Sequence, residues 1–139
     1  MDLLIISKAV KRVTNSDISK LEGIIADTEK ILSKKPIDWE GFLLLDRESH
    51  LTFAQILGNP IYEWLLETVI DNFFKFYDKF KGHKVSFTKD SLQTLIKIVE
   101  ALKEKNAEAA LAATEEHIHA GIRHIELSGD INKAIYNVN

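Results

Sequence analysis

The sequence contains no cysteine, which excludes disulfide bonds and metal sites built from thiolates. Proline occurs twice and glycine six times, so few residues interrupt helices in this chain of 139 residues. The apolar run near the N-terminus is too short for a signal peptide or a membrane span, because a bilayer requires about 20 apolar residues. We therefore expect a cytoplasmic protein with no membrane partner.

Concentrated positive charge is also absent. The net charge is −3, and the lysines and arginines form no basic cluster. Affinity for nucleic acids comes largely from cationic side chains that displace counterions from phosphates. We therefore expect that this chain by itself does not bind DNA tightly. Its 45% hydrophobic and 28% charged residues instead indicate one folded domain over residues 1–139.

Apolar residues recur at helical spacing along nearly the whole chain, without the alternation typical of strands. Helix boundaries are marked by a capping box at Thr14 and Asp17, by the N-cap residues Asp38 and Asn106, and by Gly58 and Pro60. We expect helices over residues 3–13, 15–33, 39–57, 60–80, 88–105 and 107–127, with a loop over 81–87. Six helices with short connections predict an all-α antiparallel bundle.

The stretch LLLDRESHLTF, residues 43–53, carries Asp46 and His50 one turn apart within an apolar helix. At about 100° per residue, both fall near the middle of the apolar stripe and therefore point into the bundle. The stripe consists of Trp39, Phe42, Leu43, Phe53 and Leu57. A buried ionised carboxylate is costly unless it is paired or bound to a metal. Two interpretations stay open: a satisfied core network, or a cavity in which both side chains bind a metal or a polar ligand.

The sixth expected helix places His117 beside small residues, which leave space for a neighbouring helix or for a ligand. These neighbours are Ala110, Ala113, Ala120 and Gly121. His124 lies on the same edge of the apolar stripe, whereas Glu115, Glu116, His119 and Arg123 face the other way. His83 falls in the expected loop, and we assign it a surface role.

Apolar side chains cover more than half of the girth of the fourth expected helix. They are Ile61, Leu65, Leu66, Val69, Ile70, Phe73, Phe76, Tyr77 and Phe80. A helix with so wide an apolar surface is central to a bundle or lies in an oligomer interface. We expect a homodimer.

Several motifs occur in a characteristic order. They are Thr14-Asn-Ser-Asp17-Ile-Ser-Lys-Leu21, Asp46-x3-His50, Gly58-Asn59-Pro60, Glu100-Ala101-Leu102, the segment 106–110, and His117. In order and spacing they resemble the C-terminal effector-binding domain of FadR-subfamily GntR transcriptional regulators, called the FCD domain. The resemblance covers about residues 4–127.

The resemblance implies a helical bundle with a central cavity, in which many family members hold a divalent metal through one aspartate and three histidines. Carried over by position, Asp46, His50 and His117 match three of these four ligands. Carboxylate and imidazole suit zinc, nickel, iron or manganese. In the family, a small carboxylate effector binds beside or onto the metal and changes how paired DNA-binding domains sit on an operator.

The chain departs from the family pattern at two points. The remaining family histidine would lie 22 residues before His117, where this sequence has Leu95. We therefore expect a cavity bordered by Asp46, His50, Leu95 and His117, with three metal ligands and one hydrophobic wall. The family's N-terminal winged-helix domain has no counterpart here, so the resemblance implies a fragment or truncated relative that reaches DNA only through a domain outside this chain.

The expected function is that of a sensor domain that binds a small-molecule effector, dimerises and catalyses nothing. One alternative is a carboxylate/histidine metalloprotein or metalloenzyme, although a di-iron bundle needs two Glu-x-x-His motifs and only Glu116-x-x-His119 occurs. The other alternative is a structural bundle with a buried Asp46–His50 network. No nucleophile motif and no glycine-rich phosphate loop is present.

Overall fold

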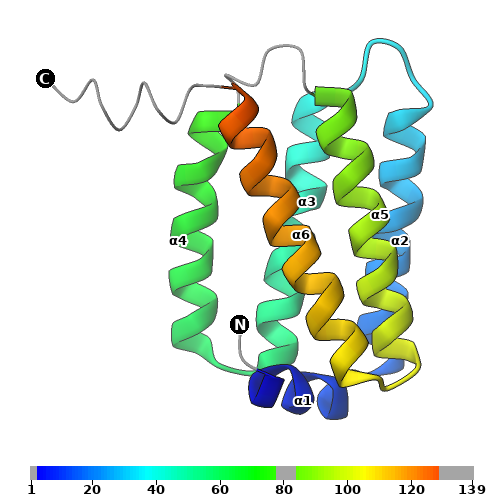
Figure 1. The fold of residues 1–139 in the computed structure, drawn as a ribbon, viewed down its shortest axis with the longest axis vertical. Helices are drawn as coiled ribbons and strands as arrows, with labels where there is room; N and C mark the ends of the chain where they lie inside the picture. The colour runs from blue at the N-terminus through cyan, green and yellow to red at the C-terminus, as the bar shows by residue number, and fades with distance from the viewer. Residues whose placement is uncertain (1–2, 78–83, 129–139) are drawn as a thin grey trace, which may run out of the picture.

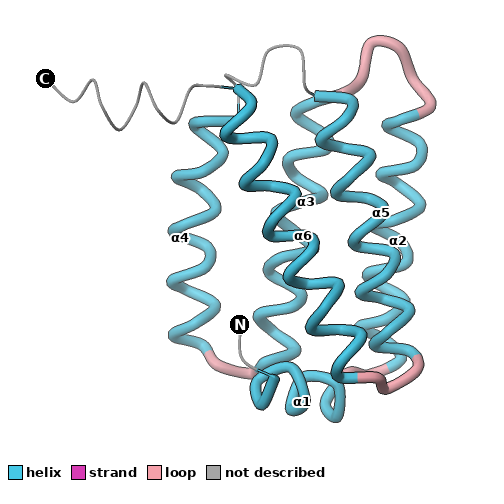
Figure 2. The backbone as a smooth tube through the Cα atoms, viewed as in Figure 1, coloured by secondary structure: helices cyan, strands magenta, loops and turns pink. Residues whose placement is uncertain are grey.

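The computed structural model describes residues 3–77 and 84–128. This part of the chain forms six helices and no strand: α1 (Leu3–Arg12), α2 (Asn15–Leu32), α3 (Trp39–Leu57), α4 (Pro60–Tyr77), α5 (Lys84–Lys103) and α6 (Ala107–Ser128). The long helices α2 to α6 run alternately up and down, and α1 lies across one end of them (Figure 1). The loops drawn between them are confined to the two ends of the bundle (Figure 2). The predicted all-α antiparallel bundle is confirmed.

Local signals in the sequence define most helix ends as predicted. The Thr14 hydroxyl accepts from Asp17 N, and the Asp17 carboxylate accepts from Thr14 N, which completes the capping box. Asp38 caps α3 by accepting from the backbone N–H of Gly41. Gly58 ends α3 with a φ of 70°, a left-handed conformation that glycine adopts without steric cost.

The predicted loop over residues 81–87 is wrong at its C-terminal side, because α5 already begins at Lys84. Phe87 is buried, and its ring packs edge-on against Trp39 and Phe42 of α3, with ring centroids 6.1 and 5.8 Å apart. Burial of this ring favours helix where the local sequence gives only a weak signal. Residues 78–83, which include His83, lie outside the described residues.

The core lies mainly between α1, α2, α3, α5 and α6. The predicted inward side chains of α5 are all buried: Leu92, Leu95, Ile98, Val99 and Leu102. Trp39, Phe42, Leu43 and Phe87 form a second cluster near the other end of the bundle. The site described below therefore lies on helices that are fixed by apolar contacts on both sides of it.

Two cationic side chains attach α1 across the end of the bundle. Arg12 Nη1 donates to the carbonyl of Leu57, the last residue of α3, at 2.7 Å. Lys105 Nζ donates to the carbonyls of Val10 and Val13 at 3.1 and 3.2 Å. Carbonyls at helix ends lack partners within the helix, so cations are favourable there. These two side chains thus add to the buried apolar contacts of Ile6, Ala9 and Val10 in holding α1 in place.

Arg47 links α3 to α4. Its guanidinium donates to Asp71 Oδ1 at 2.9 Å and to Glu67 Oε1 at 2.7 Å.

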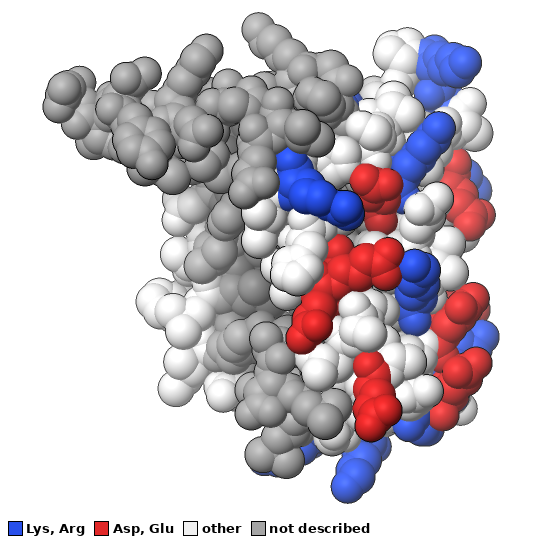
Figure 3. Space-filling model, in the orientation of Figure 1, with Lys and Arg blue, Asp and Glu red and all other residues white. Residues whose placement is uncertain are grey.

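On the face in Figure 3, acidic and basic side chains are interspersed, without a broad patch of one sign. None of the described helices is long and apolar enough to cross a lipid bilayer.

Candidate functional site

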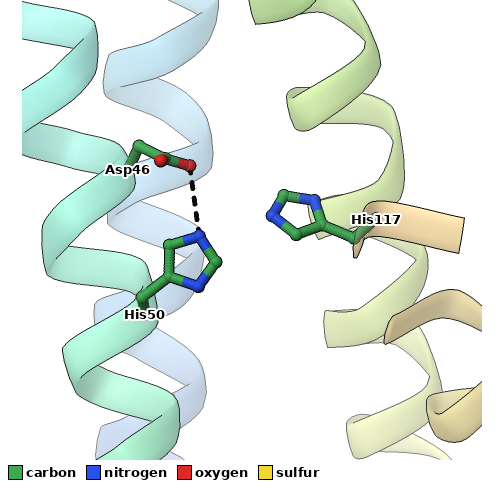
Figure 4. Close-up of side chains that lie close together, drawn as sticks. All are labelled: Asp46, His50 and His117. Carbon is green, nitrogen blue, oxygen red and sulfur yellow. Dashed lines mark ion pairs between the residues drawn. The ribbon is translucent and has the colours of Figure 1, made fainter. Parts of the chain in front are cut away.

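Asp46, His50 and His117 converge between α3 and α6 (Figure 4). The Asp46 side chain is 6% exposed, and that of His50 is 31% exposed. His50 Nε2 lies 3.6 Å from Asp46 Oδ1, and the rings of His50 and His117 have centroids 5.3 Å apart. Each residue offers one ligand atom, and these atoms all lie within 4.8 Å of one another. The inward direction inferred from the stripe on α3 agrees with the burial of Asp46.

The Asp46 carboxylate has only long contacts among the described residues. Ser91 Oγ donates to Asp46 Oδ1 at 3.4 Å, and His50 Nε2 is at 3.6 Å. Hydrogen bonds to a carboxylate are ordinarily 2.7–3.0 Å long, so neither contact fully satisfies this group. The carboxylate is therefore buried beside groups that attract it but lie too far away to replace its hydration.

Charge is distributed unequally over the three side chains. Burial alone would raise the pKa of Asp46. The charge and hydrogen bond of His50 lower it, with smaller contributions from His117 and Ser91, and the sum of these effects holds the pKa of Asp46 below its ordinary value. Burial opposes the charged form of His50, but the charge of Asp46 raises the pKa of His50 above its ordinary value. Burial and the charge of His50 lower the pKa of His117 to about 4. At neutral pH, Asp46 is thus ionised and His117 is neutral.

Thr94 of α5 orients the ring of His117. Its hydroxyl lies 2.6 Å from His117 Nδ1, and also 3.0 Å from the carbonyl of Asp90. A helical threonine commonly donates its single hydroxyl proton to the carbonyl one turn earlier, so we assign Thr94 as the acceptor of His117 Nδ1–H. Nε2 then keeps its lone pair, and in Figure 4 this nitrogen faces Asp46 and His50.

Sequence reasoning missed Ser91 and Thr94 as neighbours of the site. The missed signal was their spacing, because positions 91, 94 and 98 share one face of α5. Leu95, the position at which the family resemblance places a histidine, is 5% exposed and belongs to the apolar core cluster. Hydroxyls, rather than a fourth imidazole, therefore reach the site from α5.

A cavity of about 230 Å³ lies beside the two histidines. The described residues that line it are Ile6, Ala9, His50, Phe53, Ala54, Ile56, Leu57, Ile98, Leu102, Ala110, Thr114, His117 and Ile118. Asp46 and Leu95 are not among these wall residues. The predicted site residues are thus divided: His50 and His117 line the cavity, Asp46 lies one turn along α3 from His50 and outside the wall, and Leu95 packs in the core.

The other polar residues of α6 lie elsewhere. Glu115, Glu116, His119 and Arg123 are exposed, as predicted, and Glu116 pairs with Lys97 at 3.0 Å. The single Glu-x-x-His motif therefore faces outward and does not contribute to a bundle-core metal site. His124 is buried and contacts Asp90 of α5 at 2.7 Å, apart from the cluster of Asp46, His50 and His117.

The donor set of Asp46, His50 and His117 fits a divalent metal. One carboxylate and two imidazoles are ligands that zinc and other first-row metals accept, with further positions left for water or a ligand. Ligand atoms of a tetrahedral zinc ion lie about 3.4 Å apart, because each is about 2.1 Å from the metal. Since the three donor atoms are already within 4.8 Å of one another, small side-chain rotations would bring them to this spacing.

Comparison with known proteins identifies the family. A sequence model described as the FCD domain matches residues 1–120. No curated protein and no solved structure is similar enough to count as a match. The matched segment contains α1 to α5 and most of α6, including all three converging side chains. The chain therefore belongs to the FCD domain family, which forms the C-terminal domain of FadR-type GntR regulators.

Proposed function

We propose that this domain binds a small carboxylate effector with the help of a divalent metal held by Asp46, His50 and His117. FCD domains belong to transcription regulators, which are not enzymes. The observation that carries the proposal is the convergence of one carboxylate and two imidazoles beside an apolar cavity. A structural Asp–His network explains this arrangement less well, because the contacts of the buried carboxylate are too long for good hydrogen bonds.

Each residue has a distinct role in this proposal. Asp46 supplies the negative charge that a cation requires, and His50 and His117 supply nitrogen ligands, which bind a metal only in the unprotonated form. Thr94 holds the His117 ring so that Nε2, rather than Nδ1, points at the shared position. When bound, the metal would supply a positive centre that attracts the carboxylate of an effector.

The metal proposal is tested by calorimetry on protein that has been chelated and then titrated with zinc. We expect one site per chain in the parent and loss of that site in His50→Ala and in His117→Ala. His119→Ala is the matched control, because His119 is an exposed histidine on the same helix. Equal affinity in all four proteins would rule out the proposed metal site.

We also propose that the chain forms a homodimer through α4. Ile61, Trp64 and Leu65 occupy one face of this helix and are 71%, 64% and 50% exposed. Such a group of large apolar side chains favours a protein interface. Light scattering should show a dimer for the parent and for Val85→Glu, a control at an exposed apolar site on α5, and a monomer for Trp64→Glu. A parent that remains monomeric at high concentration would contradict the proposal.

A further inference from the structure

The cavity has one polar end and one apolar end. His50 and His117 lie at the polar end. Seven residues along α3 separate His50 from Leu57, and seven along α6 separate His117 from Ala110, which corresponds to about 10 Å of depth. Ile6 and Ala9 of α1 line the far end. A ligand anchored at the histidines would therefore extend toward α1.

The described wall residues offer few polar partners along this depth. Among them, apart from the two histidines, Thr114 alone has a polar side chain, and its hydroxyl donates to the carbonyl of Ala110 at 2.8 Å. No lysine, arginine, aspartate or glutamate is among these described wall residues. A hydroxyl or a second carboxylate on the far part of a ligand would be buried without a partner, which is unfavourable.

The volume limits the size of the ligand. A cavity of about 150 Å³ holds benzene, which has six non-hydrogen atoms. In proportion, a cavity of about 230 Å³ accepts a ligand of about nine such atoms. A carboxylate head leaves about six of these atoms for the body of the ligand.

We propose that the effector is a monocarboxylate with a short hydrocarbon body, of a size close to hexanoate or octanoate. This inference rests on the proposed function, because the carboxylate must be held at the histidine end of the cavity. It adds that the body of the ligand is apolar, so that dicarboxylates and hydroxy acids of equal length bind more weakly.

The inference is tested by calorimetry on the zinc-loaded and on the metal-free protein, with butyrate, hexanoate, octanoate, adipate and 6-hydroxyhexanoate. From butyrate to hexanoate, we expect affinity to rise about fourfold for each added methylene, as apolar burial predicts. Adipate and 6-hydroxyhexanoate match hexanoate in chain length but carry a polar group at the far end. We expect both to bind at least about tenfold more weakly than hexanoate.

A matched pair of variants locates the hydrocarbon body. Ala110→Leu fills the far end of the cavity and should weaken octanoate binding by about tenfold or more, with a smaller effect on butyrate. Ala112→Leu makes the same substitution on the exposed side of α6 and should leave both affinities unchanged. The ligand series on the unmodified protein does not depend on the folding of either variant.

The outcomes separate this inference from the proposed function. If adipate or 6-hydroxyhexanoate binds as tightly as hexanoate, and His117→Ala removes that binding, the effector site stands and the apolar-body inference is wrong. If none of these acids binds, with or without zinc, both are wrong. Equal affinity for butyrate and octanoate would also overturn the inference.

Discussion

Among the described residues, two carboxylate–histidine pairs have opposite arrangements. In the pair of Asp46 and His50, the carboxylate is 6% exposed, the imidazole is 31% exposed, and 3.6 Å separates them. In the pair of Asp90 and His124, the imidazole is 9% exposed, the carboxylate is 44% exposed, and 2.7 Å separates them. The second carboxylate keeps part of its hydration and forms a short hydrogen bond, whereas the first has neither.

This difference distinguishes a structural pair from a candidate binding site. A buried charge is favourable only when nearby groups compensate for its lost hydration. In the second pair the Asp90 carboxylate avoids this cost, because it is 44% exposed and lies 2.7 Å from His124 Nε2. The ring of His124 also packs edge-on against Phe87, with centroids 5.3 Å apart. Asp46 would meet this condition if a cation occupied the position that it shares with His50 and His117.

The difference between the two pairs is tested most directly by exchanging each carboxylate for an amide. Asp46→Asn removes the only charged ligand, and we expect zinc affinity to fall by more than about 100-fold. Asp90→Asn is the matched control on α5 and should leave zinc affinity unchanged. Calorimetry measures both. Similar affinity losses in the two variants would show that the pairs do not differ as proposed.

The structural role of the second pair is measured by the free energy of unfolding in denaturant. His124→Ala removes a buried ring together with its hydrogen bond to Asp90, and we expect a loss of about 2–3 kcal/mol. Arg123→Ala, at the exposed neighbouring position, should change stability by less than about 0.5 kcal/mol. A stable His124→Ala that has lost zinc binding would instead assign His124 to the metal site.

The pH dependence of stability provides a further test of the site formed by Asp46, His50 and His117. His117 has a pKa of about 4 in the fold against 6.5 for an unperturbed imidazole. The unfolded chain therefore binds a proton that the fold excludes, and stability falls as pH falls from 6.5 toward 4. His50 has a raised pKa, so its contribution is already complete below pH 6.5 and stays constant in this window.

For the metal-free protein, we therefore expect a loss of about 2 kcal/mol in the free energy of unfolding between pH 6.5 and 4.5. His117→Gln keeps a polar side chain of similar size but does not titrate, so its pH dependence should be weaker by about this amount. Denaturant unfolding at both pH values makes the comparison. Parallel curves for the parent and the variant would show that His117 does not bind protons as described.

The smallest expected effect concerns the hydroxyl that orients His117. Thr94→Val preserves the shape of the side chain but removes the acceptor of Nδ1–H, and we expect zinc affinity to fall by about tenfold. Thr88→Val is the matched control, because Thr88 is also a buried threonine of α5 and its hydroxyl donates to the carbonyl of Lys84. An equal effect of both substitutions would indicate a general change in α5.

Helix periodicity was sufficient to predict the bundle and the inward direction of Asp46. It did not predict Ser91 and Thr94, although their spacing places them on one face of α5, because serine and threonine within helices commonly bond to their own backbone and spacing alone does not separate the two cases. The start of α5 was missed because the burial of Phe87 depends on rings far away in the sequence. The sequence also could not predict that His50 and His117 line the cavity whereas Leu95 packs in the core. This difference depends on how α5 and α6 pack rather than on the spacing within either helix.

The attachment of α1 has a consequence for the kinetics of ligand exchange. Ile6 and Ala9 close the far end of the cavity, and α1 is held there partly by Arg12 and Lys105. Ends of helices that are held by a few hydrogen bonds open locally at a lower free energy than the global unfolding transition. We therefore expect the residence time of a bound ligand to depend on how often α1 opens. Substitutions at Arg12 or Lys105 would then change dissociation rates although neither side chain lines the cavity.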